Sequence, residues 1–338
     1  MQTAPTAPTA PVVVVGAGIA GVACARELSA AGLPVRLLDR GRRIGGRMGA
    51  KRLAARPTDL GASYLTASDP AFEAVVADWE SRGLARPWTD TFTVLSADED
   101  TRTTSGPVRW GAPGALRSLV EDLAADLDLE QTAVEQVDRA ADGALVVDGQ
   151  MAAAVVLAMP DEQARRLLGP GLRPEVTGLD RPSEPIIALA AWWSARTWDD
   201  VDPGGRFHGA FVNGDDDLGW IADDGRRRGD DAPVLVAHST PELAGRHLAD
   251  PAGAGGPMLA ALQRLLGVRD PLGTHVHRWS LARPLGERAD PFLLTGGHSA
   301  PLGVCGDGWG SAPKVEGAWL SGRALGQALA ARLTPAAQ

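Results

Sequence analysis

Three glycines near the N-terminus have the types and spacing to bind a phosphate group. Gly16, Gly18 and Gly21 form G-x-G-x-x-G directly after the β-branched run 12–15. In a βαβ unit the first glycine permits a tight turn, the second lets a diphosphate approach the backbone, and the third lets the helix pack on the strand. The first helical residues, Ile19 and Ala20, would present free N–H groups, which together with the helix dipole favour an anion.

An acidic residue follows at the position where this unit needs one. Asp39 ends a second predicted strand, 34–38, about 20 residues after the glycines, where an acid bonds ribose hydroxyls. Arg40 then begins a loop that leads to Gly45, Gly46, Arg47 and Met48. A Gly-Gly pair lets backbone lie flat against a ligand, and the following arginine would be a fixed cation near the diphosphate. The alternative is a glycine-rich turn in an ordinary α/β fold with a solvated basic loop.

These motifs in this order resemble the flavin-dependent amine-oxidase superfamily, whose members carry the glycine motif, an acid and then Gly-Gly-Arg. The resemblance implies that Gly61, Ala62 and Ser63, within D-x-G-A at 59–62, lie near the flavin ring. It also implies that Gly306-Asp307 bonds the ribityl chain and phosphate, and that a final helix directs its N-terminus at the flavin. Further FAD contacts are implied at Val134, Met159, Val315, Glu316, Gly317 and Ala318. For Val134, a valine that only fills the core is the alternative.

Longer segments resemble the bacterial renalase-like flavoproteins within this superfamily. They comprise 45–52, 59–67, 109–114, 277–284, 304–307 and 315–322. Such enzymes take a hydride from the 2- or 6-dihydro isomers of NAD(P)H, give β-NAD(P)⁺ and pass the electrons to O₂ as H₂O₂. The resemblance therefore implies noncovalent FAD, a dihydropyridine nucleotide as substrate and O₂ as acceptor. The loop 308–313 and the region 197–256 depart from the family, which leaves the substrate preference open.

The inventory of residues suits hydride transfer from a dihydropyridine. Such a donor is already electron-rich, so the protein needs to stack it at a near-attack distance of about 3–3.5 Å and can omit a general base. Amine oxidases of the superfamily often clamp the amine between two tyrosines and hold a lysine near the flavin. This chain has one tyrosine, ten tryptophans and only two lysines, Lys51 and Lys314. The expected pocket residues are Tyr64, Trp110, His277, Trp279 and Arg283. Interior packing is the alternative for the tryptophans and for the histidine.

Length and composition exclude several other classes. A chain of 338 residues is typical of two domains. The net charge of −9 argues against a nucleic-acid groove. Two cysteines cannot form a disulfide framework, and histidine and cysteine show no metal-ligand pattern. No run approaches the ~18 apolar residues of a spanning helix.

The start, 1–11, has no basic residue and predicts a flexible tail rather than a signal peptide, so we expect a cytoplasmic location. Arg226–Arg228 are expected in a solvated turn.

The expected fold is α/β (α+β). A Rossmann-like FAD-binding domain with a parallel sheet and helices is joined to a smaller antiparallel-sheet substrate domain, the arrangement of p-hydroxybenzoate hydroxylase and the amine oxidases. After a tail at 1–10, the FAD-binding domain is expected at 11–65, 107–168 and 285–338, and the substrate domain at 66–106 and 169–284. Helices are predicted over 70–88, 114–127, 161–168, 241–248 and 258–266, and strands over 92–95, 131–137, 144–147, 151–157, 186–193, 209–212, 220–222 and 234–238.

Three other functions stay open at this point. The protein could be an amine or other small-molecule oxidase or desaturase of the same superfamily. It could be a flavin-binding protein without turnover. It could also be an NAD-dependent dehydrogenase, which would be colourless when purified. The oligomeric state and the choice between NAD and NADP are not predicted.

Overall fold

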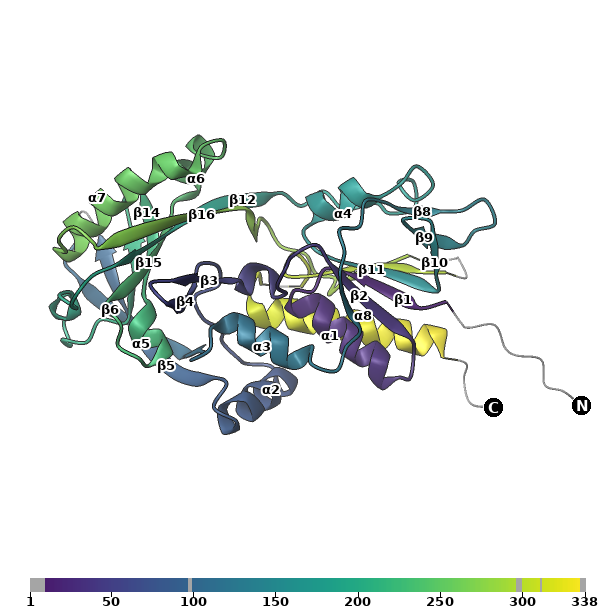
Figure 1. Cartoon of the computed structure of the whole chain (residues 1–338), viewed down its shortest axis with the longest axis horizontal. Helices are drawn as coiled ribbons and strands as arrows, with labels where there is room; N and C mark the ends of the chain where they lie inside the picture. The colour runs from purple at the N-terminus through teal and green to yellow at the C-terminus, as the bar shows by residue number, and fades with distance from the viewer. Residues whose placement is uncertain (1–9, 97–98, 296–299, 311, 335–338) are drawn as a thin grey trace, which may run out of the picture. The chain divides into compact units, whose positions relative to one another are not determined.

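The computed structural model describes residues 10–96, 99–295, 300–310 and 312–334, which form two compact units (Figure 1). The first unit comprises the chain up to Gly46, residues 120–182, and the chain from Pro284 onward. The second comprises 47–119 and 183–283. The predicted tail 1–10 lies outside the described residues except for Ala10.

A six-stranded sheet forms the core of the first unit. Its order is β17 (Leu293–Leu294), β18 (Leu302–Cys305), β11 (Ala154–Ala158), β1 (Val12–Val15), β2 (Val35–Asp39) and β7 (Leu129–Gln131). All neighbours are parallel except β17 with β18. The chain leaves β1 for β2 on one side and later returns to β11 on the other. The carboxyl end of β1 is therefore a topological switch point, where such sheets bind ligands.

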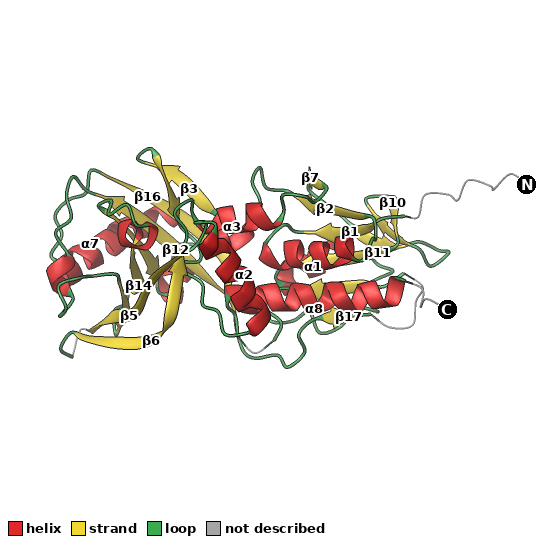
Figure 2. Ribbon diagram, turned by 90° about the horizontal axis from the view of Figure 1, so that it is seen from below, coloured by secondary structure: helices red, strands yellow, loops and turns green. Residues whose placement is uncertain are grey.

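Two helices lie side by side against this sheet, α1 (Ile19–Ala30) and α8 (Val315–Leu333) (Figure 2). Glycines in α8 allow the close approach, because a Cβ on Gly322 would lie 1.9 Å from the Ala20 carbonyl oxygen. The unit also contains α4 (Asp161–Leu167) and a small sheet of β8 (Val137–Arg139), β9 (Leu145–Val147) and β10 (Gln150–Ala152). Helix α3 (Leu116–Leu123) crosses the boundary between the two units in sequence.

A seven-stranded sheet forms the core of the second unit. Its order is β16 (Gly273–Pro284), β12 (Ser183–Trp192), β15 (Val234–Ser239), β14 (Leu218–Asp223), β13 (Gly209–Asn213), β5 (Arg86–Ser96) and β6 (Arg102–Gly111). Helices α6 (Pro241–Arg246) and α7 (Gly255–Leu266) cover one face, where a large apolar cluster of this unit lies. On the other face, Leu60 packs on Ala188, Ala190 and Val236 beside the hairpin β3 (Ala50–Leu53) and β4 (Arg56–Asp59).

The expected fold class is confirmed, with corrections to its parts. The second sheet is mixed rather than antiparallel, because β13 pairs in parallel with β5. The second unit is not the smaller one, since its two segments together exceed the three of the first. The two units and the expected domains also differ in their boundaries: 47–65 and 107–119 belong to the second unit and 169–182 to the first.

Several predicted elements end earlier or change type. The helix predicted over 70–88 is α2 (Pro70–Ser81), because Gly83 takes a left-handed φ of 70° and the chain enters β5 at Arg86. The strand predicted over 131–137 is divided between the ends of β7 and β8. The predicted second arm of the hairpin, 151–157, is also divided, because β10 pairs with β9 whereas β11 joins the parallel sheet.

The remaining elements are short. They are α5 (Asp224–Arg228), η1 (Gly46–Met48), η2 (Asp199–Val201) and η3 (Pro251–Ala254). The helix α5 holds the arginines that were predicted to lie in a solvated turn, and two of them, Arg227 and Arg228, are buried. Among the helices of the described residues, none has the length and apolar character needed to cross a membrane.

Candidate functional site

The glycine motif of the first unit forms a crowded turn with one open position. A Cβ on Gly16, whose φ is 105°, would lie 2.6 Å from the Ala158 carbonyl oxygen, and a Cβ on Gly21 would lie 1.9 Å from that of Gly16. A Cβ on Gly18 would meet nothing within 4 Å. Gly18 also caps α1 without a side-chain hydrogen bond, and the first turn has no acidic residue. The space over Gly18 and the start of α1 can therefore receive an anion.

Asp39 ties this turn to the loop that follows β2. Its carboxylate accepts hydrogen bonds of 2.7 Å from the backbone N–H groups of Ala17 and Gly41. An ionised carboxylate offers about four lone-pair positions, so acceptor capacity remains for ribose hydroxyls. The neighbouring Arg40 is exposed.

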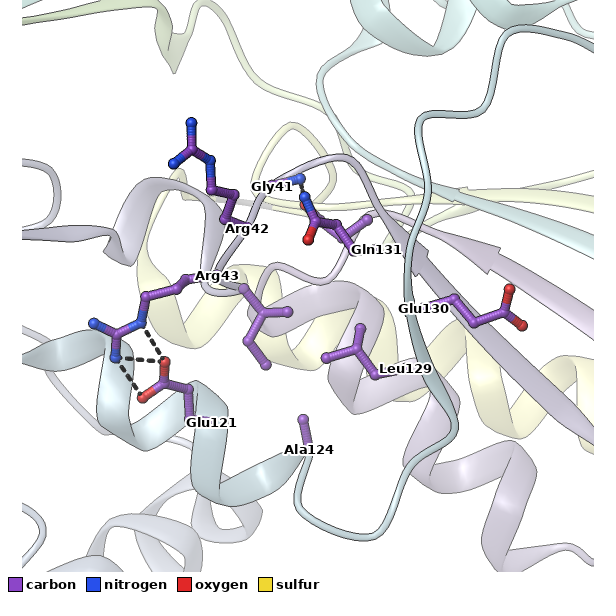
Figure 3. Close-up of a pocket in the computed structure, with 10 residues that line it drawn as sticks. Gly41, Arg42, Arg43, Glu121, Ala124, Leu129, Glu130 and Gln131 are labelled. Carbon is purple, nitrogen blue, oxygen red and sulfur yellow. Dashed lines mark hydrogen bonds and ion pairs between the residues drawn. The ribbon is translucent and has the colours of Figure 1, made fainter.

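A cleft of about 370 Å³ opens beside Asp39 (Figure 3). The loop 41–44, the end of α3 and the strand β7 line it. Figure 3 shows Arg43 directed at Glu121, with which it forms an ion pair of 2.7 Å, whereas Arg42 points away from that pair. Both a carboxylate and guanidinium groups thus border the cleft, which is suited to a polar group rather than to an apolar ligand.

The pair Gly45-Gly46 lies against the glycine turn. Its φ values of 109° and 51° favour glycine. The N–H of Gly45 donates to the Ala17 carbonyl at 2.9 Å, and a Cβ on Gly46 would lie 3.5 Å from the Cα of Gly18. The Gly-Gly pair and the glycine motif are therefore in direct contact, although they lie far apart in the sequence.

The C-terminal motif begins at another special backbone position. Gly306 has a φ of 147°, its N–H donates to the Ser321 hydroxyl at 3.0 Å, and a Cβ on it would lie 4.0 Å from the Met159 carbonyl oxygen. Asp307 follows, half-buried. Helix α8 then begins at Val315 without a side-chain cap, and Glu316 in its first turn is buried. Val134 packs partly against the core of the first unit.

Two arginines that the sequence analysis did not single out hold the loop after Asp307. Arg181 donates to the carbonyl oxygens of Gly308 and Gly286. The guanidinium of Arg288 lies 3.9 Å from the centre of the buried Trp309 ring and forms an ion pair of 2.8 Å with Asp161. The loop that departs from the resembled family is therefore anchored by its own set of contacts.

In the second unit, the segment 59–64 is fixed by backbone contacts. Ala62 donates to the Arg47 carbonyl at 2.9 Å, and a Cβ on Gly61 would lie 1.9 Å from that oxygen and 3.1 Å from the Trp279 ring. The Arg47 side chain donates to the Ala282 carbonyl at 3.1 Å, and Met48 is buried. Only glycine fits at position 61, which places backbone directly against Trp279.

A buried ion cluster supports the same segment. Arg227 pairs with Asp224 and, at 3.7 Å, with Asp59, and it donates to the Ser63 carbonyl at 2.8 Å. Arg228 lies 3.4 Å from Asp59. Burial raises the pKa of Asp59 to about 6 against the opposing field of Arg227. The cluster binds both ends of the segment 59–63. Its signal in the sequence is the run of three arginines between two pairs of aspartates at 223–231.

Tyr64 belongs to an aromatic cluster. Its ring centre lies 6.2 Å from that of Trp88, 5.5 Å from Phe92 and 5.8 Å from Trp220. Burial raises the pKa of its hydroxyl. Trp220 also donates to the Ser63 hydroxyl at 3.0 Å. The predicted partner Trp110 instead joins the segment through its backbone, which exchanges hydrogen bonds with Leu65.

Trp279 and His277 form a second group on the same sheet. The Trp279 indole donates to the Leu60 carbonyl at 2.9 Å, and the ring centres of Trp279 and His277 lie 4.5 Å apart. Burial lowers the pKa of His277, so its imidazole is neutral near pH 7. Arg283 is separate from this group: it pairs with Glu184 at 2.5 Å and its side chain is 56% exposed.

Two family models match the chain. One, described as NAD(P)-binding Rossmann-like domain, matches residues 14–79, and the other, described as flavin containing amine oxidoreductase, matches residues 81–329.

Similar solved structures cover nearly the whole chain. A putrescine oxidase bound to putrescine is 15% identical with a TM-score of 0.70, covering 96% of this chain and 99% of its own. A protoporphyrinogen oxidase-like protein from Exiguobacterium sp. is 15% identical with a TM-score of 0.71, at 96% and 99% coverage. Cyclohexylamine oxidase from Brevibacterium oxydans is 15% identical with a TM-score of 0.72, at 96% and 98% coverage. At these identities the likeness shows the fold.

Proposed function

We propose that this chain, which belongs to the flavin-containing amine oxidoreductase family, is an FAD-dependent oxidase of misreduced nicotinamide nucleotides. It would take a hydride from the 2- or 6-dihydro isomers of NAD(P)H and release β-NAD(P)⁺. The two electrons, with the hydride's proton and one from solvent, would reduce O₂ to H₂O₂. The family establishes FAD and the oxidoreductase class, and the choice of donor and acceptor is our proposal.

The residues of the first unit fit FAD. Gly18 leaves open space at the uncapped start of α1 for the diphosphate. Asp39 retains acceptor capacity for the adenosine ribose. Gly306 and Asp307 precede another helix that starts without a side-chain cap, α8. When bound, FAD supplies the two-electron acceptor, and the protein needs to supply position and electrostatics.

The observation that carries the choice of donor is the flat, uncharged wall around Trp279. The indole is fixed by the Leu60 carbonyl, and the neutral His277 ring lies against it. A dihydropyridine is planar and regains aromaticity when it loses hydride, so a planar wall that restricts its orientation is sufficient. The imidazole in its neutral form adds a hydrogen-bond donor or acceptor for a polar group of the donor.

The lysines of the chain also favour this donor over an amine. A lysine that acts on water near a flavin would be buried, because burial is what lowers its pKa. Lys51 and Lys314 are both exposed, and they are the only lysines in the sequence. A dihydropyridine donor does not need such a group, because it is oxidised without loss of a proton from nitrogen.

Amine oxidation is the second candidate, and the cluster around Tyr64 favours it. Four aromatic rings surround one another there, and such rings can enclose a neutral amine. Two of the similar structures are enzymes named for putrescine and cyclohexylamine. The two candidates differ in substrate charge and planarity, so one experiment separates them.

The deciding experiment is anaerobic mixing of the purified yellow protein with 6-dihydro-NAD, putrescine or cyclohexylamine in separate runs, with the flavin absorbance followed in time. We expect rapid bleaching by 6-dihydro-NAD alone, and return of colour with H₂O₂ when air is admitted. Bleaching by an amine and not by the dihydropyridine would overturn the proposal. If the protein stays yellow with every donor, it binds flavin but oxidises none of the three.

Variants at Trp279 test the wall itself. Trp279→Ala should slow bleaching by 6-dihydro-NAD by about 10²-fold, the effect expected when a reacting group loses its fixed position. Trp279→Phe keeps a flat ring, so its rate of bleaching by 6-dihydro-NAD should fall less. Ser280→Ala is the matched control, because Ser280 is the exposed next residue of β16 and points to the opposite side. Equal rates in all three variants would remove Trp279 from the site.

A further inference from the structure

A row of flat rings follows one face of β16. Successive side chains of a strand alternate between faces, so His275, His277 and Trp279 share one face. Val276 lies on the other, where its side chain is 3.1 Å from the Cβ position of Gly255 in α7. The Trp192 ring continues the row, since it lies 2.3 Å from the Cβ position of Gly273. Two imidazoles therefore stand between two indoles.

The strand β3 brings a lysine to this row. Leu53 packs with Trp279 in the apolar cluster around Leu60, and Lys51 lies two residues before Leu53, on the same side of β3. Burial lowers the pKa of both His275 and His277, and the Lys51 ammonium adds to the lowering of both, so its charge acts on both imidazoles. Lys51 itself is exposed to solvent.

The groups gathered here are bases without an acid among them. The charged side chain that acts on both imidazoles is Lys51. Glu184, at the start of the neighbouring strand β12, is paired with Arg283. One nitrogen of His275, Nε2, is buried without a hydrogen-bond partner in the described part of the chain. A positive group next to a buried ring nitrogen that lacks a partner is an arrangement that can bind a phosphate.

We propose that Lys51, His275 and His277 form an anion subsite that binds the diphosphate of a dinucleotide hydride donor, beside the ring wall of Trp279. This inference rests on the proposed function, because it names the part of the donor that these residues recognise. Lys51 supplies the fixed charge, and the imidazoles supply hydrogen bonds that strengthen when the anion favours their protonated form. Arg283, which the sequence suggested for this purpose, is instead committed to Glu184.

The first test measures binding without any reaction. ADP-ribose has the diphosphate and lacks the nicotinamide, so it is titrated calorimetrically into the FAD-loaded protein. Lys51→Met should weaken its binding roughly tenfold, as expected when one charge-assisted hydrogen bond is lost. His277→Phe, which keeps a ring against Trp279, should also weaken it. Arg52→Met removes the same charge from the opposite side of β3 and should change affinity less than about twofold. Unchanged affinity in both Lys51→Met and His277→Phe would overturn the subsite.

The second test separates this subsite from the proposed function. Flavin bleaching is measured anaerobically with 6-dihydro-NAD and with 1-methyl-1,6-dihydronicotinamide, which has no phosphate. Lys51→Met should raise the half-saturating concentration of 6-dihydro-NAD roughly tenfold and leave the limiting rate of bleaching by this donor unchanged. The rate of bleaching by the phosphate-free donor should not change. Equal effects on both donors would overturn the subsite. If neither donor bleaches the wild-type protein, the proposed function fails, and the ADP-ribose titration still decides whether the anion subsite exists.

Discussion

Replacement of Arg227 by methionine should destabilise the second unit strongly. The Arg227 and Asp224 side chains that form the ion pair are both 0% exposed. Arg227 also pairs with Asp59 and donates to the Ser63 carbonyl. Methionine keeps the apolar stem and removes the charge and every donor. Two buried carboxylates then lose an arginine, and a backbone carbonyl loses its donor.

The expected magnitude follows from these partners. Removal of one member of a buried ion pair costs about 3–5 kcal/mol, since the other charge stays buried. Asp224 keeps Arg56, and Asp59 keeps Arg228, so the lower end applies and the free energy of unfolding should fall by about 3 kcal/mol. The double variant Arg227→Met, Asp224→Asn should cost less than the sum of the two single changes, because it removes a charge of each sign.

Urea unfolding followed by tryptophan fluorescence measures this effect. All tryptophans except Trp309 and Trp319 lie in the second unit, so the signal reports the unit that contains Arg227. Arg82→Met is the control, because Arg82 is 44% exposed and forms a surface pair with Asp78, for which a loss of about 0.3–0.5 kcal/mol is expected. A loss under about 1 kcal/mol in Arg227→Met, close to that of the control, would refute the reasoning from buried charge.

Four further predictions concern other sites. Burial lowers the pKa of His238 to about 4, so the unfolded chain binds a proton that the folded one does not, and stability should fall by up to about 3 kcal/mol as pH drops from 6.5 to 4; this slope should flatten in His238→Gln. Gly18→Ala should leave the FAD-free protein as stable as wild type but weaken FAD binding, whereas Gly21→Ala should destabilise the protein itself. Urea unfolding midpoints measure the stability of each variant, and flavin absorbance measures its FAD content. Asp307→Ala should lower FAD occupancy roughly tenfold or more with an unchanged circular dichroism spectrum. Burial raises the pKa of the Cys305 thiol to about 12, so acid precipitation should release all the flavin into the supernatant, and flavin retained in the pellet would contradict noncovalent binding.

The nucleotide half of the fold could be predicted because its chemistry is local. A glycine turn, a helix start and an acid at the end of the next strand are fixed by short-range geometry. Periodicity also located most strands of the second unit. It misplaced the end of α2, because Gly83 ends the helix and Trp88 continues the apolar pattern within a strand.

The second half of the candidate site depends on long-range contacts that a single sequence does not reveal. Arg227 looked solvated because its neighbours in sequence are charged, yet its partners Asp59 and Ser63 lie far away along the chain. Arg181 and Arg288 also act over more than a hundred residues. Trp279 and His277 were predicted from their types, whereas Lys51 joined them only when the strands were placed.

The electrostatics of the β16 row connects the fold to the choice of donor. An amine arrives mainly as an ammonium ion. The Lys51 ammonium, whose charge acts on both His275 and His277, repels it. A dinucleotide arrives as an anion, which the same charge attracts. The ion pairs of Asp59 and Glu184 remove two carboxylates that could reverse this preference. Lys51→Glu should therefore weaken the binding of a dinucleotide donor more than Lys51→Met does, and it should favour the binding of cationic amines. Competition between ADP-ribose and putrescine for the oxidised protein would measure this reversal.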